Sequence, residues 1–93
     1  MIIKLNPCYK YREIAGIHYL IPCMQDSKGS EKPVQLTDTA FWIWQQLKKG
    51  TEYNDIVESM IGEYDVDLKT SQRAVSGFIK MLIDQGMASR SGF

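Results

Sequence analysis

Residues 34–67 have the sequence VQLTDTAFWIWQQLKKGTEYNDIVESMIGEYDVD, and this stretch decides the fold. Thr37 and Asp38 are both good helix N-caps, and apolar residues follow them at helical spacing. Gly50 comes after two lysines, which is a common C-terminal pattern of a helix. Thr51 is a good N-cap for a second helix. The predicted apolar stripes are Ala40, Ile43, Trp44 and Leu47 in the first helix and Tyr53, Ile56, Val57, Met60, Ile61 and Tyr64 in the second.

A third helix follows a polar break at Asp65-Val66-Asp67. Its apolar pattern continues to Gln85, and Gly86 is placed as a C-terminal cap. Beyond Met87 we expect a short extended tail. The three helices are therefore predicted at about 38–48, 52–64 and 68–85.

The N-terminal third is rich in residues that favour strands. The segment 8–23 holds two Tyr- and Ile-rich runs around Ala15-Gly16, which predicts a β-hairpin. In a symmetric hairpin Ile14 faces Ile17, Tyr11 faces Leu20 and Cys8 faces Cys23. Facing cysteines raise the question of a disulfide, but in a reducing compartment we expect them to stay reduced and to act as small apolar residues.

Residues 24–32 are polar and predict a loop, and residues 33–36 predict a short third strand. Pro33 is tolerated at the start of a strand or on a sheet edge, so this strand is a candidate edge strand. Val34 and Leu36 are expected on one face, because side chains alternate along a strand.

Composition and net charge narrow the classes of protein to which this chain can belong. The 93 residues are 44% hydrophobic and 24% charged, as in an ordinary folded domain, and predict a single one. The formal net charge is zero, whereas nucleic-acid-binding domains usually carry a basic excess. No stretch approaches the roughly 18 apolar residues of a membrane span, and the N-terminus lacks a signal-peptide pattern. We therefore expect a cytoplasmic protein.

The chain has few of the residue combinations that catalysis needs. His18 is its one histidine, and the predicted hairpin pairs it with Glu13, away from any nucleophile other than the two cysteines. Two cysteines and one histidine do not readily supply a zinc site. There is no phosphate-binding glycine motif. We expect no enzyme activity, no metal and no cofactor.

The third predicted helix has a broad apolar arc. Its central stripe is extended on one side by Ala74 and Met81, with Gly77 just beyond them. A glycine inside a helix costs roughly 1 kcal/mol relative to alanine, so some close neighbour should offset it. That neighbour is either the backbone of a bound partner or a loop or sheet of the same domain. The central stripe is Val75, Phe78, Ile79 and Leu82.

Two further features are open to two interpretations. Lys69, Arg73 and Lys80 form a basic ridge beside Gly77, either as a solvated face or as contacts for acidic residues of a bound peptide. Trp42 lies opposite the apolar stripe of its helix. An exposed tryptophan marks a partner or self-association surface, unless the N-terminal segment folds over it.

The quoted stretch, followed by a helix that ends FIKMLIDQGMA, resembles the PqqD family, the peptide chaperones of pyrroloquinoline-quinone biosynthesis and the precursor-recognition elements of other ribosomally made, modified peptides. The resemblance covers about residues 34–88. It rests on core and capping residues, so it is more specific for fold than for ligand. The matching positions are Leu36-Thr37, Ala40, Ile43-Trp44, Gly50-Thr51, Tyr64-Asp65, Leu82 and Gly86-Met87.

The resemblance implies an α+β fold in which a three-stranded antiparallel sheet is followed by three helices, a winged helix-turn-helix-like unit. It also implies that the leader of a precursor peptide adds as a strand beside the third strand, next to the third helix, and is then modified by a partner enzyme, often a radical S-adenosylmethionine enzyme. The residues expected to bind the peptide are Val34, Gln35, Leu36, Arg73, Ala74, Gly77, Phe78, Lys80 and Met81.

The alternative is a winged-helix DNA-binding regulator, because the helical half has that shape. DNA binding requires a helix that carries several basic or amide side chains into a groove. The third helix offers Lys69, Gln72, Arg73 and Lys80, but also has Asp67 and Asp84 at its ends. We favour the peptide adaptor. A homodimer is left open.

Overall fold

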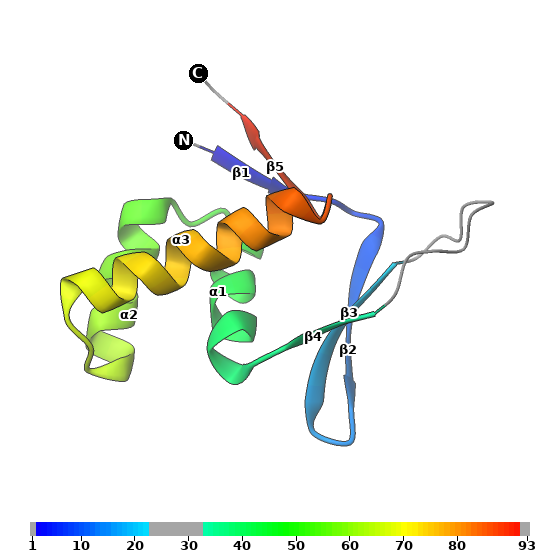
Figure 1. The fold of residues 1–93 in the computed structure, drawn as a ribbon, viewed down its shortest axis with the longest axis horizontal. Helices are drawn as coiled ribbons and strands as arrows, with labels where there is room; N and C mark the ends of the chain where they lie inside the picture. The colour runs from blue at the N-terminus through cyan, green and yellow to red at the C-terminus, as the bar shows by residue number, and fades with distance from the viewer. Residues whose placement is uncertain (1, 23–32, 92–93) are drawn as a thin grey trace.

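The computed structural model describes residues 2–22 and 33–91, and it has the predicted α+β architecture. Three helices lie to one side of a three-stranded antiparallel sheet, and the two chain ends pair above them as a second, two-stranded sheet (Figure 1). The element order is β1 (Ile2–Leu5), β2 (Tyr9–Ile14), β3 (Ile17–Pro22), β4 (Val34–Leu36), α1 (Asp38–Lys48), α2 (Tyr53–Tyr64), α3 (Leu68–Asp84) and β5 (Ala88–Ser91). None of the helices in the described residues has the length and apolar character needed to cross a bilayer.

The β2–β3 hairpin has the predicted register. Ile14 pairs with Ile17 and Tyr11 pairs with Leu20. Ala15 and Gly16 both have positive φ, 54° and 80°, as a two-residue type I′ turn requires. The expected Cys8–Cys23 pair involves a residue outside the described part of the chain, as do all of residues 24–32.

Strand β4 completes the larger sheet, whose order is β2-β3-β4. Val34 pairs with Leu20 and Leu36 pairs with His18, so both side chains point to the face that α1 covers. Leu36 is buried, Val34 is half-buried and Gln35, on the opposite face, is exposed. The alternation predicted for this strand is therefore present.

The N-cap predicted at Thr37 is present and the one predicted at Thr51 is not, while α3 begins with a cap that was not predicted from the sequence. Thr37 accepts a hydrogen bond from the Ala40 amide at 3.1 Å, and Asp67 accepts one from the Thr70 amide at 2.8 Å. The prediction that Thr51 caps α2 is wrong, because Glu52 is the N-cap residue and makes no side-chain cap bond. The Thr51 amide instead donates to the Gln46 carbonyl, so Thr51 belongs to the end of α1.

Helix α3 ends in the arrangement expected of a glycine cap. Gly86 has φ of 76°, its amide donates to the Ile83 carbonyl, and the Met87 amide donates to the Leu82 carbonyl. This pair of bonds is a Schellman motif. The motif turns the chain so that Met87 becomes buried. The extended tail predicted after Met87 is therefore not free, since it continues as β5 and pairs with β1.

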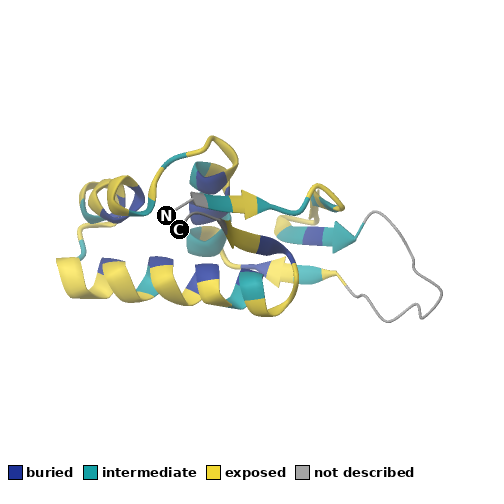
Figure 2. Cartoon of the chain, turned by 90° about the horizontal axis from the view of Figure 1, so that it is seen from above, coloured by how far each residue is buried: buried dark blue, intermediate teal, exposed yellow. Residues whose placement is uncertain are grey.

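The core lies between the three helices and the inner face of the larger sheet. Figure 2 shows buried positions on α1 and on the side of α3 that faces it. Of the predicted α1 stripe, Ile43, Trp44 and Leu47 are buried and Ala40 is half-buried. For Trp42 the sequence left open a partner surface or cover by the N-terminal segment, and the structure shows a contact with α2. Its ring is half-buried and packs edge-on against Tyr64, with the ring centroids 5.6 Å apart.

Candidate functional site

The predicted site begins at the outer edge of β4. One edge of this strand is hydrogen-bonded to β3, and within the described residues no strand pairs with the other edge. Such an edge presents backbone N–H and C=O groups to any extended segment that comes beside it. Val34 and Leu36 face inward and Gln35 faces outward. An added strand would therefore place alternate side chains toward the core and toward solvent.

The predicted helix wall is the flank of α3 that α2 does not cover. On the opposite flank, the Ser76 hydroxyl is hydrogen-bonded to the Tyr53 hydroxyl of α2 at 2.9 Å. On the open flank Ala74 and Met81 are half-buried, and Gly77 is exposed. Among the described residues, a Cβ added to Gly77 would meet no neighbouring atom within 4 Å. The described part of the chain therefore does not provide the close neighbour that we expected for this glycine.

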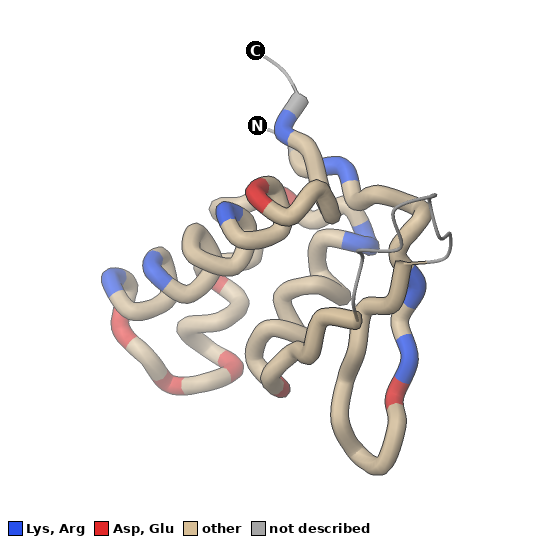
Figure 3. The backbone as a smooth tube through the Cα atoms, turned by 45° about the vertical axis from the view of Figure 1, so that its right-hand side comes forward, with Lys and Arg blue, Asp and Glu red and all other residues tan. Residues whose placement is uncertain are grey.

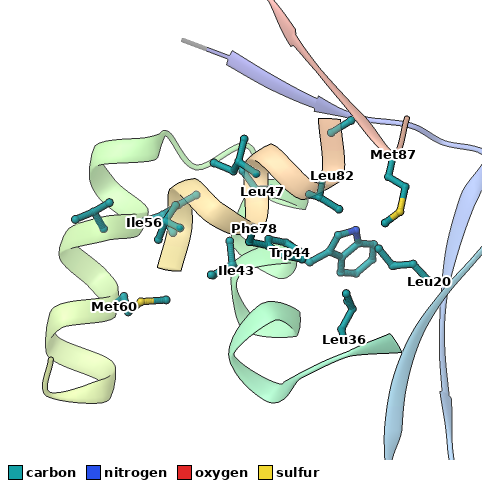
Figure 4. Packing of buried hydrophobic residues seen from close by; sticks show 14 residues of the cluster. Leu20, Leu36, Ile43, Trp44, Leu47, Ile56, Met60, Phe78, Leu82 and Met87 are labelled. Carbon is teal, nitrogen blue, oxygen red and sulfur yellow. The ribbon is translucent and has the colours of Figure 1, made fainter. Parts of the chain in front are cut away.

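Leu36 and Phe78 belong to the same hydrophobic core cluster, which joins the strand and the helix. Figure 4 shows Leu20, Leu36, Phe78, Leu82 and Met87 around the Trp44 ring. Phe78 is only 8% exposed. It therefore acts as a support beneath the predicted site more than as a free contact surface.

The basic ridge predicted on α3 is partly neutralised. Lysine and arginine positions follow one another along this helix in Figure 3. Lys80 Nζ lies 2.9 Å from Asp84 Oδ2, and both side chains are well exposed. An exposed pair of this kind contributes only about 0.3–0.5 kcal/mol, so a carboxylate of a ligand could compete for Lys80. Arg73 and Lys69 make no ion pair with other described residues.

The structure also places His18 in a set of contacts that the sequence did not predict. His18 Nδ1 lies 2.8 Å from the Tyr11 hydroxyl, and His18 Nε2 lies 3.1 Å from Asp38 Oδ1. The imidazole ring stacks on Phe41 with the centroids 4.1 Å apart. The hairpin register already placed Tyr11 diagonal to His18, so that contact could have been found. The contact with Asp38 depends on how α1 packs against the sheet.

This Tyr-His-Asp chain is suited to structure more than to nucleophilic chemistry. Burial raises the pKa of the Tyr11 phenol, and the negative charge of Glu13 raises it further. The phenol therefore stays protonated, and the Tyr11 hydroxyl and the Asp38 carboxylate each hydrogen-bond one nitrogen of the imidazole ring. These bonds connect β2 and β3 to the start of α1. Within the described ranges, no group of three or more His, Cys, Asp or Glu side chains is placed to hold a metal ion.

A cavity of about 680 Å³ lies elsewhere on the molecule. Its walls come from β1, the β1–β2 connection, β2, β3 and α1, with Met87 also lining it. None of the nine residues predicted to bind a peptide lines this cavity. The residues predicted to bind a peptide, on β4 and α3, are therefore separate from this pocket.

Comparison with known proteins gives one family and two similar structures. Residues 27–88 match the family model described as coenzyme PQQ synthesis protein D (PqqD). No curated protein sequence matches the chain significantly. One similar solved structure is described as lasso peptide synthetase B1 complexed with the leader peptide, with a TM-score of 0.81 and 24% identity over 97% of this chain and 100% of that chain. Another is TbiB1 in complex with the TbiA(beta) leader peptide, with a TM-score of 0.78 and 21% identity over 97% and 99% of the two chains.

Proposed function

The chain belongs to the PqqD family, and on that premise we propose that it is a non-catalytic adaptor that binds the leader of a ribosomally made precursor peptide and presents it to a modifying enzyme. The adaptor would act in the cytoplasm, where such precursors are made. Following the family resemblance, we propose a radical S-adenosylmethionine enzyme as its partner. The two similar structures support the first step, because both are described as complexes with a leader peptide.

The observation that carries the proposal is the outer edge of β4, which no other described strand occupies. Leader binding by strand addition uses such an edge, because backbone hydrogen bonds supply affinity and side-chain contacts supply selectivity. Val34 and Leu36 would contact the inward side chains of the leader, and Gln35 would lie beside the outward ones. None of the nine predicted residues lines the cavity of about 680 Å³. This agrees with binding by strand addition, which needs a free strand edge and no closed pocket.

The flank of α3 would form the second contact surface. Ala74 and Met81 offer half-buried apolar area, Phe78 supports them from the core, and Gly77 leaves room for the backbone of the leader. Arg73 and Lys80 lie on the same helix and would attract acidic residues of the leader. DNA binding has less support, because the net charge of the chain is zero and the start of α3 is capped by the negative Asp67.

The decisive experiment changes Gly77 and leaves the fold intact. Gly77→Leu should weaken binding of the leader by at least about tenfold, which corresponds to roughly 1.4 kcal/mol, because the new side chain fills the space for the peptide backbone. Binding is measured by titration calorimetry with the synthetic leader of the precursor encoded nearest to the gene. Gly62→Leu is the matched control, since Gly62 is also helical, exposed and without a neighbour within 4 Å.

Circular dichroism should show that both variants are folded. A folded Gly77→Leu variant that binds the leader as tightly as the unchanged protein would rule out this site. Light scattering of the free protein serves as a second check, because a homodimer formed through β4 would occupy the same edge and would compete with the leader.

A further inference from the structure

The cavity of about 680 Å³ is of a size that binds ligands, but its polar groups are unlike those of a small-molecule site. Trp44, Leu47 and Met87 form a buried apolar floor, and Lys4, Lys10 and Lys48 stand at exposed positions around it. A small-molecule site usually has a few buried polar groups that converge on the ligand. An apolar floor inside a charged, exposed rim is more typical of the centre of a protein–protein contact.

The charge around the cavity has one sign. No aspartate or glutamate lines it, and the three lysines make no ion pair with other described residues. No acidic (red) segment appears in β1 or in the β1–β2 connection in Figure 3. The Lys48 ammonium lies 5.0 Å from the centre of the Trp44 ring, so a cation is held directly over the aromatic floor. On a chain whose net charge is zero, this is a local positive site.

The cavity is independent of the proposed leader site. Neither β4 nor α3 contributes a lining residue, so a leader bound along β4 would leave the cavity accessible. Trp44 lines the cavity and also packs in the cluster that contains Leu36 and Phe78. The two sites therefore share a buried wall but no lining residue.

We propose that this cavity is a second peptide-binding site, which receives an acidic segment of the modifying enzyme that carries one large apolar side chain. The apolar side chain enters over Trp44, Leu47 and Met87, and neighbouring carboxylates pair with Lys4, Lys10 and Lys48. The identity of the partner rests on the proposed adaptor function. The chemistry of the occupant rests on the apolar floor and on the unbalanced positive rim.

The probe is a synthetic peptide, acetyl-Asp-Glu-Phe-Glu-Asp-amide, titrated into the ¹⁵N-labelled protein. We expect saturable shifts of the Trp44 indole resonance and of the Lys4, Lys10 and Lys48 amides, and weaker binding as salt rises, because exposed charges are screened. A neutral peptide with Asn and Gln at the acidic positions, and an acidic peptide with Ala in place of Phe, should each bind at least about fivefold more weakly.

The double variant Lys10→Gln, Lys48→Gln should weaken the acidic peptide at least about fivefold, again because rim charges supply the attraction. The double variant Arg12→Gln, Arg90→Gln is the matched control, since it removes the same charge at two exposed positions outside the cavity and outside the leader site, and it should leave this binding unchanged. Equal binding of the neutral peptide, shifts confined to β4 and α3, or no saturable binding would each overturn the proposal.

The two proposals fail in different ways. The Lys10/Lys48 variant should bind the leader normally, and the Gly77→Leu variant should bind the acidic peptide normally. If the unchanged protein binds the acidic peptide but not the leader, the adaptor function is contradicted. If the unchanged protein binds the leader but not the acidic peptide, the second site is contradicted.

Discussion

At the scale of single residues, one carboxylate defines the start of the helix that forms the wall of the proposed leader site. Asp67 precedes α3 and accepts the Thr70 amide hydrogen, which satisfies one of the donors left free in the first turn. The same hydrogen bonding to Thr70 lowers the pKa of Asp67 below its ordinary value of 3.8. The negative charge also lies at the positive end of the helix dipole.

This lowered pKa predicts how stability depends on pH. The charged carboxylate is favoured in the folded state, so its contribution is complete above about pH 4 and is lost as the pH falls through the lowered folded pKa. Asp67→Asn keeps a capping oxygen without a titrating group, so its melting temperature should approach that of the unchanged protein as the pH falls from 7 to 2.5. Asp67→Ala should melt several degrees lower than Asp67→Asn at every pH, because it has no cap.

Thermal melts followed by circular dichroism give the comparison. A constant difference in melting temperature between the unchanged protein and Asp67→Asn, from pH 7 down to pH 2.5, would show that the Asp67 carboxylate does not titrate differently in the folded state.

At the scale of secondary-structure elements, α1 and α3 are ended by the same device and α2 is not. Gly50 and Gly86 have φ of 87° and 76°, and both are followed by amides that donate back into the last helical turn. Helix α2 ends at Asp65, a non-glycine residue with φ of 55°. The two glycine caps set the directions in which α1 leads to α2 and α3 leads to β5.

The glycines inside α2 and α3 allow a prediction about the helices themselves. A methyl group added at Gly62 or Gly77 meets no neighbour within 4 Å, so alanine should simply reduce the freedom of the unfolded chain. Gly77→Ala should raise the free energy of unfolding by roughly 0.5–1 kcal/mol, and Gly62→Ala by somewhat less because it lies near the end of α2. Urea denaturation measures both values.

The two substitutions should differ in their effect on leader binding. Gly77→Ala is expected to weaken leader binding despite the more stable fold, whereas Gly62→Ala should not change it. If Gly77→Ala lowered stability, the space beside Gly77 would have to be occupied in the free protein.

At the scale of the whole molecule, the two ends of the chain meet and close the fold. β1 pairs with β5 from Leu5 opposite Ala88 to Ile2 opposite Ser91. Asn6 makes two side-chain hydrogen bonds next to this strand pair. Its NH₂ group donates to the Gly86 carbonyl at 3.0 Å, and its side-chain oxygen accepts the hydrogen of the Cys8 backbone amide at 2.9 Å. Its backbone amide also donates to the Met87 carbonyl. Asn6 thus couples the first strand to the end of α3.

Asn6→Ala should therefore loosen the chain ends selectively. The loss of two side-chain hydrogen bonds should cost about 1–2 kcal/mol of unfolding free energy. Native-state hydrogen exchange should show faster exchange for the β1 and β5 amides than for the buried helices. Asn54→Ala, an exposed change on α2, serves as the control. Uniform acceleration across all elements would mean that the two-stranded sheet does not open as a separate unit.

The sequence by itself determined the helices, the hairpin register and most of the caps. Those signals act over a few residues, as with Thr37 and the Ala40 amide, or Gly86 and the last turn of α3. It also indicated β4 as an edge strand and proposed the nine peptide-binding residues, which remain predictions for binding experiments. Thr51 was wrongly predicted to be the N-cap of α2, because it lies between the end of α1 and the start of α2.

Only the tertiary structure decided the β1–β5 pairing, the contact of His18 with Asp38, the packing of Trp42 on Tyr64 and the lysine-rimmed cavity. In each case the partners come from different elements of the chain. Contacts of that kind leave no periodicity or spacing in the sequence, because they depend on the direction in which each element leaves the preceding turn and on how its faces pack.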